Sequence, residues 1–299
     1  MRSEKKEVRS ESRVNIRDLR KLFTDSELEL GTATEGNNKD STWLVMKEEQ
    51  PLYVLKEVAA EDAERVYERL KHIYDQTNAI PEPLCVFRQG HDFACVVNRW
   101  FDGGQLSERA NEVYAAKQFS KAFHDLHHCS LLEIDKSENP ASRFHRAICQ
   151  YDQINIADSF RKPYQLTILQ RIVELKDYYL PDLCYTHIDL HMGNIIVDRG
   201  NICFIDSCEI RPDNPYRDYA YIVSLHPSSQ NGFWRAFLQT CNLNHDVWPQ
   251  LKLFSLIKAF QIMECHYDKG IEPIESMKVW GALTASYGDS LELEKHKWL

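Results

Sequence analysis

The chain lacks any apolar run long enough to cross a membrane. A transmembrane helix needs about 20 consecutive apolar residues, whereas the long apolar segment from Leu251 to Met263 is interrupted by Lys252 and Lys258. The N-terminus is charged and no apolar stretch follows it, so it does not resemble a secretory signal. We therefore expect a short flexible tail at residues 1–12, no membrane association and a cytoplasmic protein.

Paired cysteines and excess positive charge are also missing. The nine cysteines form no Cys-x-x-Cys pair and no repeated spacing, which argues against a disulfide framework. The formal net charge is -9, whereas binding to the phosphate backbone of nucleic acids relies on a surplus of lysine and arginine. We therefore expect no nucleic-acid partner. The negative charge is compatible with a cationic small-molecule substrate, and equally with many ordinary cytoplasmic proteins.

What the sequence does contain is a series of strand patterns followed by helix patterns. Strands are predicted at residues 26–32, 42–46, 52–58, 85–88 and 93–98, and helices at 60–74, 111–128, 166–179, 233–241 and 247–266. This order is typical of an α+β protein. We predict two lobes: a β-rich N-terminal lobe at residues 13–100 and a mainly helical C-terminal lobe at 101–299, with a hinge at residues 102–104.

One short segment of the C-terminal half concentrates polar side chains around a predicted β-hairpin. Asp189 and Asn194 flank a short loop, the hairpin runs from Asn194 to Asp206, and Arg199-Gly200-Asn201 forms its turn. A hairpin returns its second strand to where the first began, so Asn194 and Asp206 are expected to be neighbours. Two carboxylates and one amide would then meet at one end of a small sheet.

This set of side chains suits phosphoryl transfer. The transferred group is highly negative, so a hard cation with oxygen ligands must neutralise it, and a carboxylate must orient the attacking hydroxyl and take its proton. Protein kinases use the spacing Asp-x-x-x-x-Asn followed by a later metal-binding Asp. Ordinary turn chemistry is the alternative explanation for an isolated Asp and Asn. The predicted hairpin and Asp206 at its far end favour the catalytic explanation for Asp189 and Asn194.

The details differ from protein kinases and resemble another family. Here Ile188 follows His187, and Ile205-Asp206-Ser207 stands where Asp-Phe-Gly would be. The pattern His-x-Asp-Leu-His-x-x-Asn, a hairpin and Ile-Asp is similar to the aminoglycoside phosphotransferase and choline kinase superfamily, with a protein-kinase-like fold. This resemblance is strongest from residue 183 to 220 and extends more weakly over 26–265.

The resemblance implies a role for each matching residue. Asp189 would be the catalytic base, Asn194 and Asp206 the Mg²⁺ ligands, and His187 a brace for the catalytic loop. Asp218 would have a structural role. Ile188, where many antibiotic kinases have glycine, and Ser207 depart from the common pattern without removing a catalytic atom. The implied cofactors are ATP (or GTP) and Mg²⁺.

The nucleotide side is predicted from the N-terminal half. Lys56 ends a strand that precedes a helix, much like the lysine that reaches ATP phosphates in kinases. Its helix partner would be Glu64 in the first place, then Glu68, although spacing cannot separate these from Glu61. The resemblance also places adenine against the backbone of residues 96–101, where Asn98 and Trp100 are the candidate contacts. Plain core packing is the alternative for Trp100. The loop at residues 36–41, which occupies the place of a phosphate-covering loop, is not glycine-rich.

Three functions remain open from the sequence. The first is an antibiotic kinase acting on an aminoglycoside, the second a metabolic kinase acting on choline, an amino alcohol, a sugar or homoserine, and the third a binding protein that keeps the fold without turnover. An acidic patch at residues 264–275 would attract a cationic acceptor, although solvated helix-end charge explains it as well. The sequence does not fix the oligomeric state.

Two further groups of reactive side chains lack the partners that chemistry would need. His124, His127 and His128 lie on one predicted helix, but no complete metal-ligand set accompanies them. Cys184 precedes the catalytic loop without an accompanying His/Asn pair, so a buried thiol is expected there. We expect both groups to pack structurally.

Overall fold

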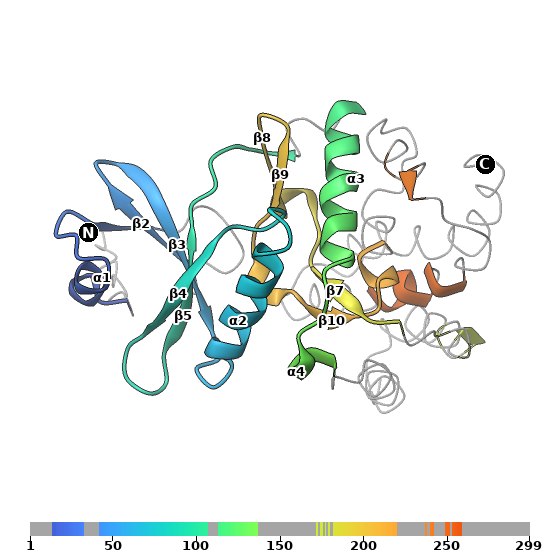
Figure 1. Ribbon diagram of the computed structural model, residues 1–299, viewed down its shortest axis with the longest axis horizontal. Coiled ribbons are helices and arrows are strands. Elements are labelled where there is room, and N and C mark those ends of the chain that lie inside the picture. The colour runs from blue at the N-terminus through green and yellow to red at the C-terminus, as the bar shows by residue number, and fades with distance from the viewer. Residues whose placement is uncertain are drawn as a thin grey trace, which may run out of the picture. The chain divides into compact units, whose positions relative to one another are not determined.

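The computed structural model describes residues 14–32, 42–106, 113–136 and 182–219, with individual positions between 172 and 179 and between 237 and 258 (Figure 1). The chain splits into two compact units. Unit 1 comprises Met1–Lys71 and Glu82–Trp100, and unit 2 comprises His72–Pro81 and Phe101–Leu299. The predicted loop at 36–41, most of the predicted helices at 166–179, 233–241 and 247–266, and the acidic patch at 264–275 lie outside the described residues.

Unit 1 is built on one five-stranded antiparallel sheet with the order β1-β2-β3-β5-β4. Its strands are β1 Glu29–Thr32, β2 Thr42–Lys47, β3 Gln50–Val58, β4 Pro83–Arg88 and β5 Ala94–Arg99. All five strand predictions are confirmed, with ends shifted by up to three residues. The ends of a strand are its least regular part, so small shifts in the predicted ends are expected.

The turn between β2 and β3 is tighter than the sequence suggests. Glu48 and Glu49 have φ values of 50° and 64°, and Lys47 pairs directly with Gln50. Two consecutive residues with positive φ make the two-residue turn that matches the twist of a hairpin. Such turns usually carry glycine or asparagine, whose absence here explains why a longer turn is predicted from the sequence.

The hydrophobic core of unit 1 includes a helix that the sequence analysis missed. Helix α1, Ile16–Leu22, places Leu19 with no exposed surface against sheet residues such as Val45 and Leu55. Asn15 caps it by accepting a hydrogen bond from the Arg17 amide at 3.0 Å. Seven residues beside a charged tail give too short a pattern for periodicity to stand out.

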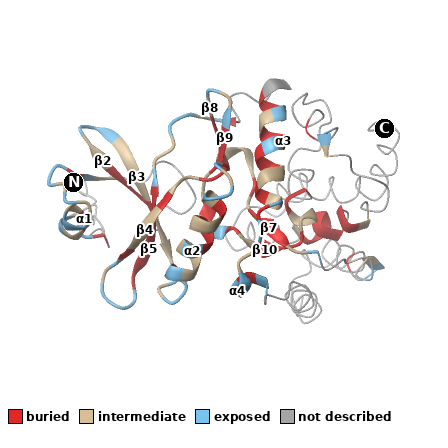
Figure 2. Cartoon of the chain, in the orientation of Figure 1, coloured by how far each residue is buried: buried red, intermediate tan, exposed pale blue. Residues whose placement is uncertain are grey.

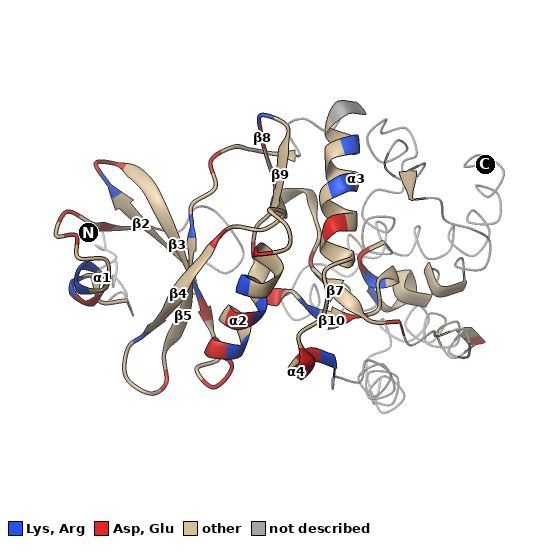
Figure 3. Ribbon diagram, viewed as in Figure 1, with Lys and Arg blue, Asp and Glu red and all other residues tan. Residues whose placement is uncertain are grey.

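Helix α2, Ala63–Tyr74, follows β3 and begins three residues later than predicted. Ala63, Leu70 and Ile73 have no exposed surface, which is the spacing of one helical face. Figure 3 shows acidic and basic residues interspersed along the rest of the helix. Because the helix begins at Ala63, Glu61 lies in the preceding turn and not on the predicted stripe of glutamates.

The described part of unit 2 contains two small sheets and the helix α3. Its elements are β6 Gly104–Gln105, α3 Val113–His127, α4 Glu133–Lys136, β7 Cys184–Thr186, the 3₁₀ turn η4 Met192–Asn194, β8 Ile195–Asp198, β9 Asn201–Phe204, the 3₁₀ turn η5 Ser207–Glu209 and β10 Arg211–Asp213. The sheets are β6-β8-β9 and β10-β7, both antiparallel. The predicted hairpin is thus confirmed as β8 and β9.

The glycines predicted as a hinge serve a close approach between strands. Gly104 pairs with Val197 as part of β6. At Gly103 a Cβ atom would lie 2.7 Å from the carbonyl oxygen of Val197 and 2.7 Å from a methyl group of Ile196. Any side chain at Gly103 would therefore push β6 away from β8.

An aromatic cluster beneath the hairpin holds unit 2 together. Phe119 of α3 packs edge-on against Phe204 of β9 at 5.7 Å and against Phe237 at 4.8 Å between ring centroids. Figure 2 shows buried residues recurring along α3 and filling β7. In β7 the fully buried Tyr185 donates to Asp135 at 3.0 Å. The α+β class predicted from the sequence is confirmed. No helix within the described ranges is long and apolar enough to span a membrane.

Candidate active site

The loop that carries Asp189 is folded by its own backbone. It leaves β7 and closes through hydrogen bonds from the Asp189 amide to the His187 carbonyl at 2.8 Å and from the His191 amide to the Asp189 carbonyl at 2.9 Å. The His191 side chain then caps η4, because its Nδ1 accepts from the Gly193 amide at 3.0 Å. These local contacts close the loop between residues 187 and 194.

Asp218 holds the start of this loop through hydrogen bonds. Its carboxylate, with no exposed surface, accepts the amides of His187 and Ile188 at 2.8 Å each, and His127 Nε2 lies 3.1 Å away. Burial by itself opposes ionisation, but the hydrogen bond and charge of His127 and the amide of His187 outweigh it, so the pKa of Asp218 falls below its usual value. The carboxylate is therefore an ionised anchor for the loop of Asp189.

Ile188 has a backbone conformation that β-branched residues rarely adopt. Its φ is 71°, in the left-handed region where glycine is the usual occupant. The hydrogen bond from its amide to Asp218 holds this conformation. The departure from glycine at this position, visible in the sequence, therefore corresponds to local strain in the loop.

We expect Ile188→Gly to leave the free energy of unfolding within about 1 kcal/mol of the wild type. Relief of left-handed strain, about 1–2 kcal/mol, offsets the entropy of glycine and the loss of a half-buried side chain. Ile195→Gly is the control, because Ile195 is buried and has an ordinary φ of -119°. Denaturant unfolding measures both variants, and equal large losses would contradict the assignment of strain to Ile188.

His187 connects the loop to the segment that carries Asp206. Its side chain is fully buried, and its Nε2 donates to the carbonyl of Ile205 at 2.8 Å. This bond joins the residue two positions before Asp189 to the residue immediately before Asp206. The predicted bracing role of His187 is a proposal that this contact supports.

Asn194 joins the same two segments from the other side. Its Nδ2 donates to the Asp189 carbonyl at 2.9 Å, and its own carbonyl accepts the Ile205 amide at 2.9 Å. Asp206, the residue after Ile205, has a left-handed backbone conformation with φ 60° and ψ 34° and lies just before η5. Hydrogen bonds therefore connect the loop of Asp189 with both ends of the β8–β9 hairpin.

The oxygen atoms of Asn194 and Asp206 are suitable ligands for a hard cation. With Nδ2 committed to the backbone, the Asn194 amide has its oxygen to offer, and Asp206 supplies a carboxylate. Within the described ranges no three His, Cys, Asp or Glu side chains gather as a closed metal site. One amide and one carboxylate suit Mg²⁺, which keeps water and phosphate oxygens as its other ligands. Asn194 and Asp206 are thus the residues that would hold it.

Two of the described side chains bring a nitrogen within 4 Å of the Asp189 carboxylate. Lys258 Nζ lies 3.6 Å from Oδ1, and His191 Nε2 lies 3.8 Å from Oδ2. Asp189 keeps 43% of its side chain exposed, whereas Lys258 keeps 18%. Sequence reasoning singled out Asp189 and missed Lys258 as a site residue. The available signal was a lysine inside the apolar run that begins at Leu251.

The candidate nucleotide residues lie in unit 1. Lys56, on β3, pairs with Thr42 of β2 and Val96 of β5. Asn98 is buried in β5 opposite Val54. The amide of Trp100, directly after β5, donates to the Leu52 carbonyl at 2.8 Å. Their contacts with a nucleotide remain proposals.

The helix glutamates have other neighbours than the one predicted. Glu64 is 61% exposed and pairs with Arg88 Nε at 3.2 Å. Glu68 is exposed on α2, and Glu61 lies before the helix. The ion partner that the structure gives Glu64 is thus Arg88, and a pair between Lys56 and a helix glutamate stays a prediction.

The two groups predicted to be structural lie in packed surroundings. Burial raises the pKa of the Cys184 thiol far above its usual value, so it is a poor nucleophile. His127 faces Asp218, and His128 Nδ1 lies 2.7 Å from the His124 carbonyl. The structural role expected for these histidines thus includes the contact of His127 with the Asp218 carboxylate.

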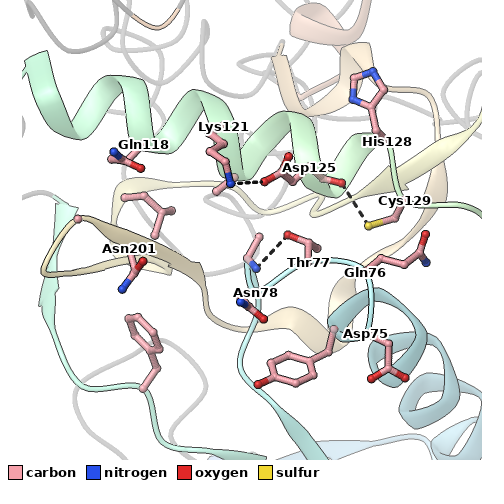
Figure 4. Close-up of a pocket in the computed structure, with 16 residues that line it drawn as sticks. Asp75, Gln76, Thr77, Asn78, Gln118, Lys121, Asp125, His128, Cys129 and Asn201 are labelled. Carbon is pink, nitrogen blue, oxygen red and sulfur yellow. Dashed lines mark hydrogen bonds and ion pairs between the residues drawn. The ribbon is translucent and has the colours of Figure 1, made fainter.

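A cavity of about 790 Å³ occupies a different part of unit 2 (Figure 4). It is lined by the segment that follows α2, by α3 and by the turn of the β8–β9 hairpin. On α3, Lys121 reaches Asp125 at 3.1 Å across one wall. Asp189, Asn194 and Asp206 do not line it, so we do not assign it to the candidate active site.

Comparison with known families decides the affiliation. A family model described as the phosphotransferase enzyme family matches residues 32–254, well over half of the chain. The chain belongs to the phosphotransferase enzyme family. No curated protein sequence matches it significantly.

Solved structures of other phosphotransferases share its fold. A thermostable mutant of aminoglycoside phosphotransferase APH(4)-Ia, in a ternary complex with AMP-PNP and hygromycin B, has a TM-score of 0.70 at 14% identity and covers 91% of this chain and 98% of its own. Spectinomycin phosphotransferase APH(9)-Ia, with ADP and spectinomycin, has a TM-score of 0.66 at 14% identity and covers 91% and 97%. The GDP complex of aminoglycoside 2'-phosphotransferase-IIIa has a TM-score of 0.61 at 12% identity and covers 90% and 97%. The kinase-like fold predicted from the sequence is confirmed.

Proposed function

We propose that this phosphotransferase moves the γ-phosphoryl group of ATP or GTP to a hydroxyl of a small molecule in the cytoplasm. The observation that carries the proposal is the pair of contacts made by Asn194, to the Asp189 carbonyl and to the Ile205 amide. They hold a candidate base and two candidate metal ligands in one small unit. Lys56, Asn98 and Trp100 are proposed nucleotide contacts, and Glu64 or Glu68 a partner of Lys56. The absence of any Cys-x-x-Cys pair or repeated cysteine spacing in the sequence supports a reducing compartment.

The proposed mechanism assigns one task to each side chain. Asp189 orients the acceptor hydroxyl and accepts its proton as the oxygen attacks the γ-phosphorus. The bond between that phosphorus and the bridging oxygen breaks, and ADP leaves. Mg²⁺, held by Asn194 and Asp206, would neutralise phosphate charge. His187 and Asp218 keep the loop in place, so that the base need not reorganise during the reaction.

Two acceptor classes have support. Structural relatives crystallised with hygromycin B and with spectinomycin support an aminoglycoside or related antibiotic, in agreement with the cationic acceptor expected from the sequence. Lys258, 3.6 Å from Asp189, supports a neutral sugar among the metabolic acceptors, because choline, an amino alcohol or homoserine would bring a second positive charge near the lysine. The presence of Lys56, Asp189, Asn194 and Asp206 together argues against a non-catalytic binding protein.

The test is ADP formation from Mg·ATP with a panel of acceptors. The panel contains aminoglycosides, spectinomycin, choline, ethanolamine, neutral sugars and homoserine, and Asp189→Asn serves as the inactive control. Acceptor-dependent ADP release that the control lacks supports the proposal. If no acceptor raises ADP release above that of the control while Mg·ATP binds, the binding-protein alternative replaces it.

Asp206→Asn is expected to weaken the binding of Mg·AMP-PNP by about tenfold or more. The substitution removes the negative ligand from a divalent cation while keeping the size of the side chain. Isothermal titration in Mg²⁺ measures the change, and titration in EDTA provides the metal-free baseline. Asp198→Asn, at the far end of β8, is the control and should bind as the wild type does. Unchanged affinity of the Asp206 variant would remove Asp206 from the metal site.

A further inference from the structure

Lys258 is a partly buried cation at the candidate base. It ends the described helical stretch 253–258, whose apolar residues are buried: Leu253, Phe254, Leu256 and Ile257. This packing leaves the stem of Lys258 little freedom and brings Nζ to 3.6 Å from Asp189 Oδ1. A lysine that is mostly removed from water normally costs stability. Its location therefore calls for a reason other than folding.

Several charged groups near Lys258 influence its pKa in opposite directions. Burial is the largest influence and lowers the pKa of Lys258 to about 8, helped by Arg217, while the carboxylates of Asp189 and Asp218 act in the opposite direction. Arg217 itself pairs with Asp213 at 2.8 Å. The lysine thus stays protonated at neutral pH at a cost that its surroundings do not fully offset.

His191, the second neighbour of Asp189, does not supply a comparable charge. Burial lowers its pKa below the usual value, and its Nδ1 accepts the Gly193 amide, which requires that nitrogen to be unprotonated. His191 is therefore a neutral ring that presents Nε2–H toward Asp189. Of these two neighbours of Asp189, Lys258 is the one that carries a full positive charge at neutral pH.

We propose that Lys258 is a positioning residue that holds the Asp189 carboxylate by Oδ1, so that the carboxylate stays ionised and correctly turned toward the acceptor hydroxyl. This inference rests on the proposed function, since it gives Lys258 a task only if Asp189 is the base. With Lys258 on one oxygen and the His191 ring beside the other, the exposed part of the carboxylate has a defined direction. An acceptor hydroxyl then meets a fixed partner instead of a rotating one.

The proposal has a pH signature in which activity and stability move in opposite directions. As pH rises through about 8, Lys258 loses its proton, the ion pair is lost and kcat falls. Its pKa in the folded protein lies below the unfolded value of about 10.5, so between these values the unfolded chain binds more protons. Folding stability from this group therefore rises over the same interval. A fall in rate above pH 8 is thus not a sign of unfolding at this residue.

The experiment compares Lys258→Met and Lys258→Arg with the wild type, and with Lys121→Met as a control on the exposed face of α3. The readouts are kcat and KM against pH for the best acceptor of the panel, the Kd of Mg·AMP-PNP and Tm. Lys258→Met should lower kcat roughly 10–100-fold without lowering Tm and with an unchanged Kd. Lys258→Arg should retain more activity than the methionine variant and move the alkaline limb beyond pH 10, because arginine stays charged. Lys121→Met should behave as the wild type does.

Two results would overturn the proposal while leaving the proposed function intact. The first is a methionine variant with wild-type kcat. The second is an arginine variant that keeps the alkaline limb near pH 8, which also decides the matter if the methionine variant fails to fold. Absence of acceptor-dependent ADP release from the wild type itself, measured first, would instead remove the proposed function and this inference with it.

Discussion

Replacing Asp189 by alanine is expected to lower kcat by about 10²–10⁴-fold while changing the Kd of Mg·AMP-PNP by less than about threefold. A positioned general base contributes a factor of that size. Asp189 is not among the proposed metal ligands, and Asn194 reaches its backbone carbonyl, which alanine retains. The loop should therefore keep its shape and its nucleotide site. Stopped assays of ADP formation measure the rate, and isothermal titration measures the affinity.

The comparison of Asp189→Ala with Asp206→Asn separates the role of a base from that of a metal ligand. The base variant should bind nucleotide and transfer slowly, whereas the metal-ligand variant should bind nucleotide weakly. Loss of nucleotide affinity in both would indicate a collapsed loop, and circular dichroism with Tm would detect it. An Asp189→Ala variant with more than about a tenth of wild-type kcat would show that another group serves as the base.

Replacing Asp218 by alanine is expected to destabilise the protein by about 2–6 kcal/mol, because two amides bonded to this buried carboxylate each lose their acceptor at a cost of about 1–3 kcal/mol. The change leaves the His187 and Ile188 amides and the His127 ring without their common acceptor. For a protein of this size the corresponding fall in Tm is on the order of 10 °C. Activity should fall too, because Ile188 would lose the bond that holds its left-handed conformation.

Asp218→Asn is the matched variant, and pH provides a second check. The His187 and Ile188 amides bond to different oxygens of Asp218, and asparagine replaces one of these oxygens by an NH₂ group, so one amide loses its acceptor and an intermediate loss of stability is expected. Because the pKa of Asp218 lies below its usual value of 3.8, its stabilisation is complete above that value and is lost as pH falls through the folded pKa. The difference in unfolding free energy between wild type and Asp218→Ala should therefore shrink as pH falls below 3.8. A difference below 1 kcal/mol at pH 7 would contradict the anchoring role.

The parts of the site that the sequence predicted are those that are contiguous in the chain. Asp189, Asn194 and Asp206 belong to one loop and one hairpin, so local spacing and strand pairing were enough to bring them together. The same holds for the strands of unit 1, whose alternation of buried and exposed residues is visible in any short window.

The parts that the sequence did not predict depend on contacts between distant segments. His127 and Lys258 reach Asp218 and Asp189 through packing of helices that have no local pattern pointing to those carboxylates. The two amides accepted by Asp218 depend on the φ of Ile188, a backbone property that its side chain disfavours. Glu48 and Glu49 likewise adopt positive φ where the sequence offers no glycine. In each case tertiary context overrides local preference.

The most direct test of the central claim is a crystal structure of the protein with Mg²⁺ and AMP-PNP. The account predicts a cation bound by the Asn194 amide oxygen and the Asp206 carboxylate, bridging phosphate oxygens, with the γ-phosphoryl group facing Asp189. A cation and nucleotide bound elsewhere, for example in the cavity beside α3, with Asn194 and Asp206 in contact with neither, would contradict it.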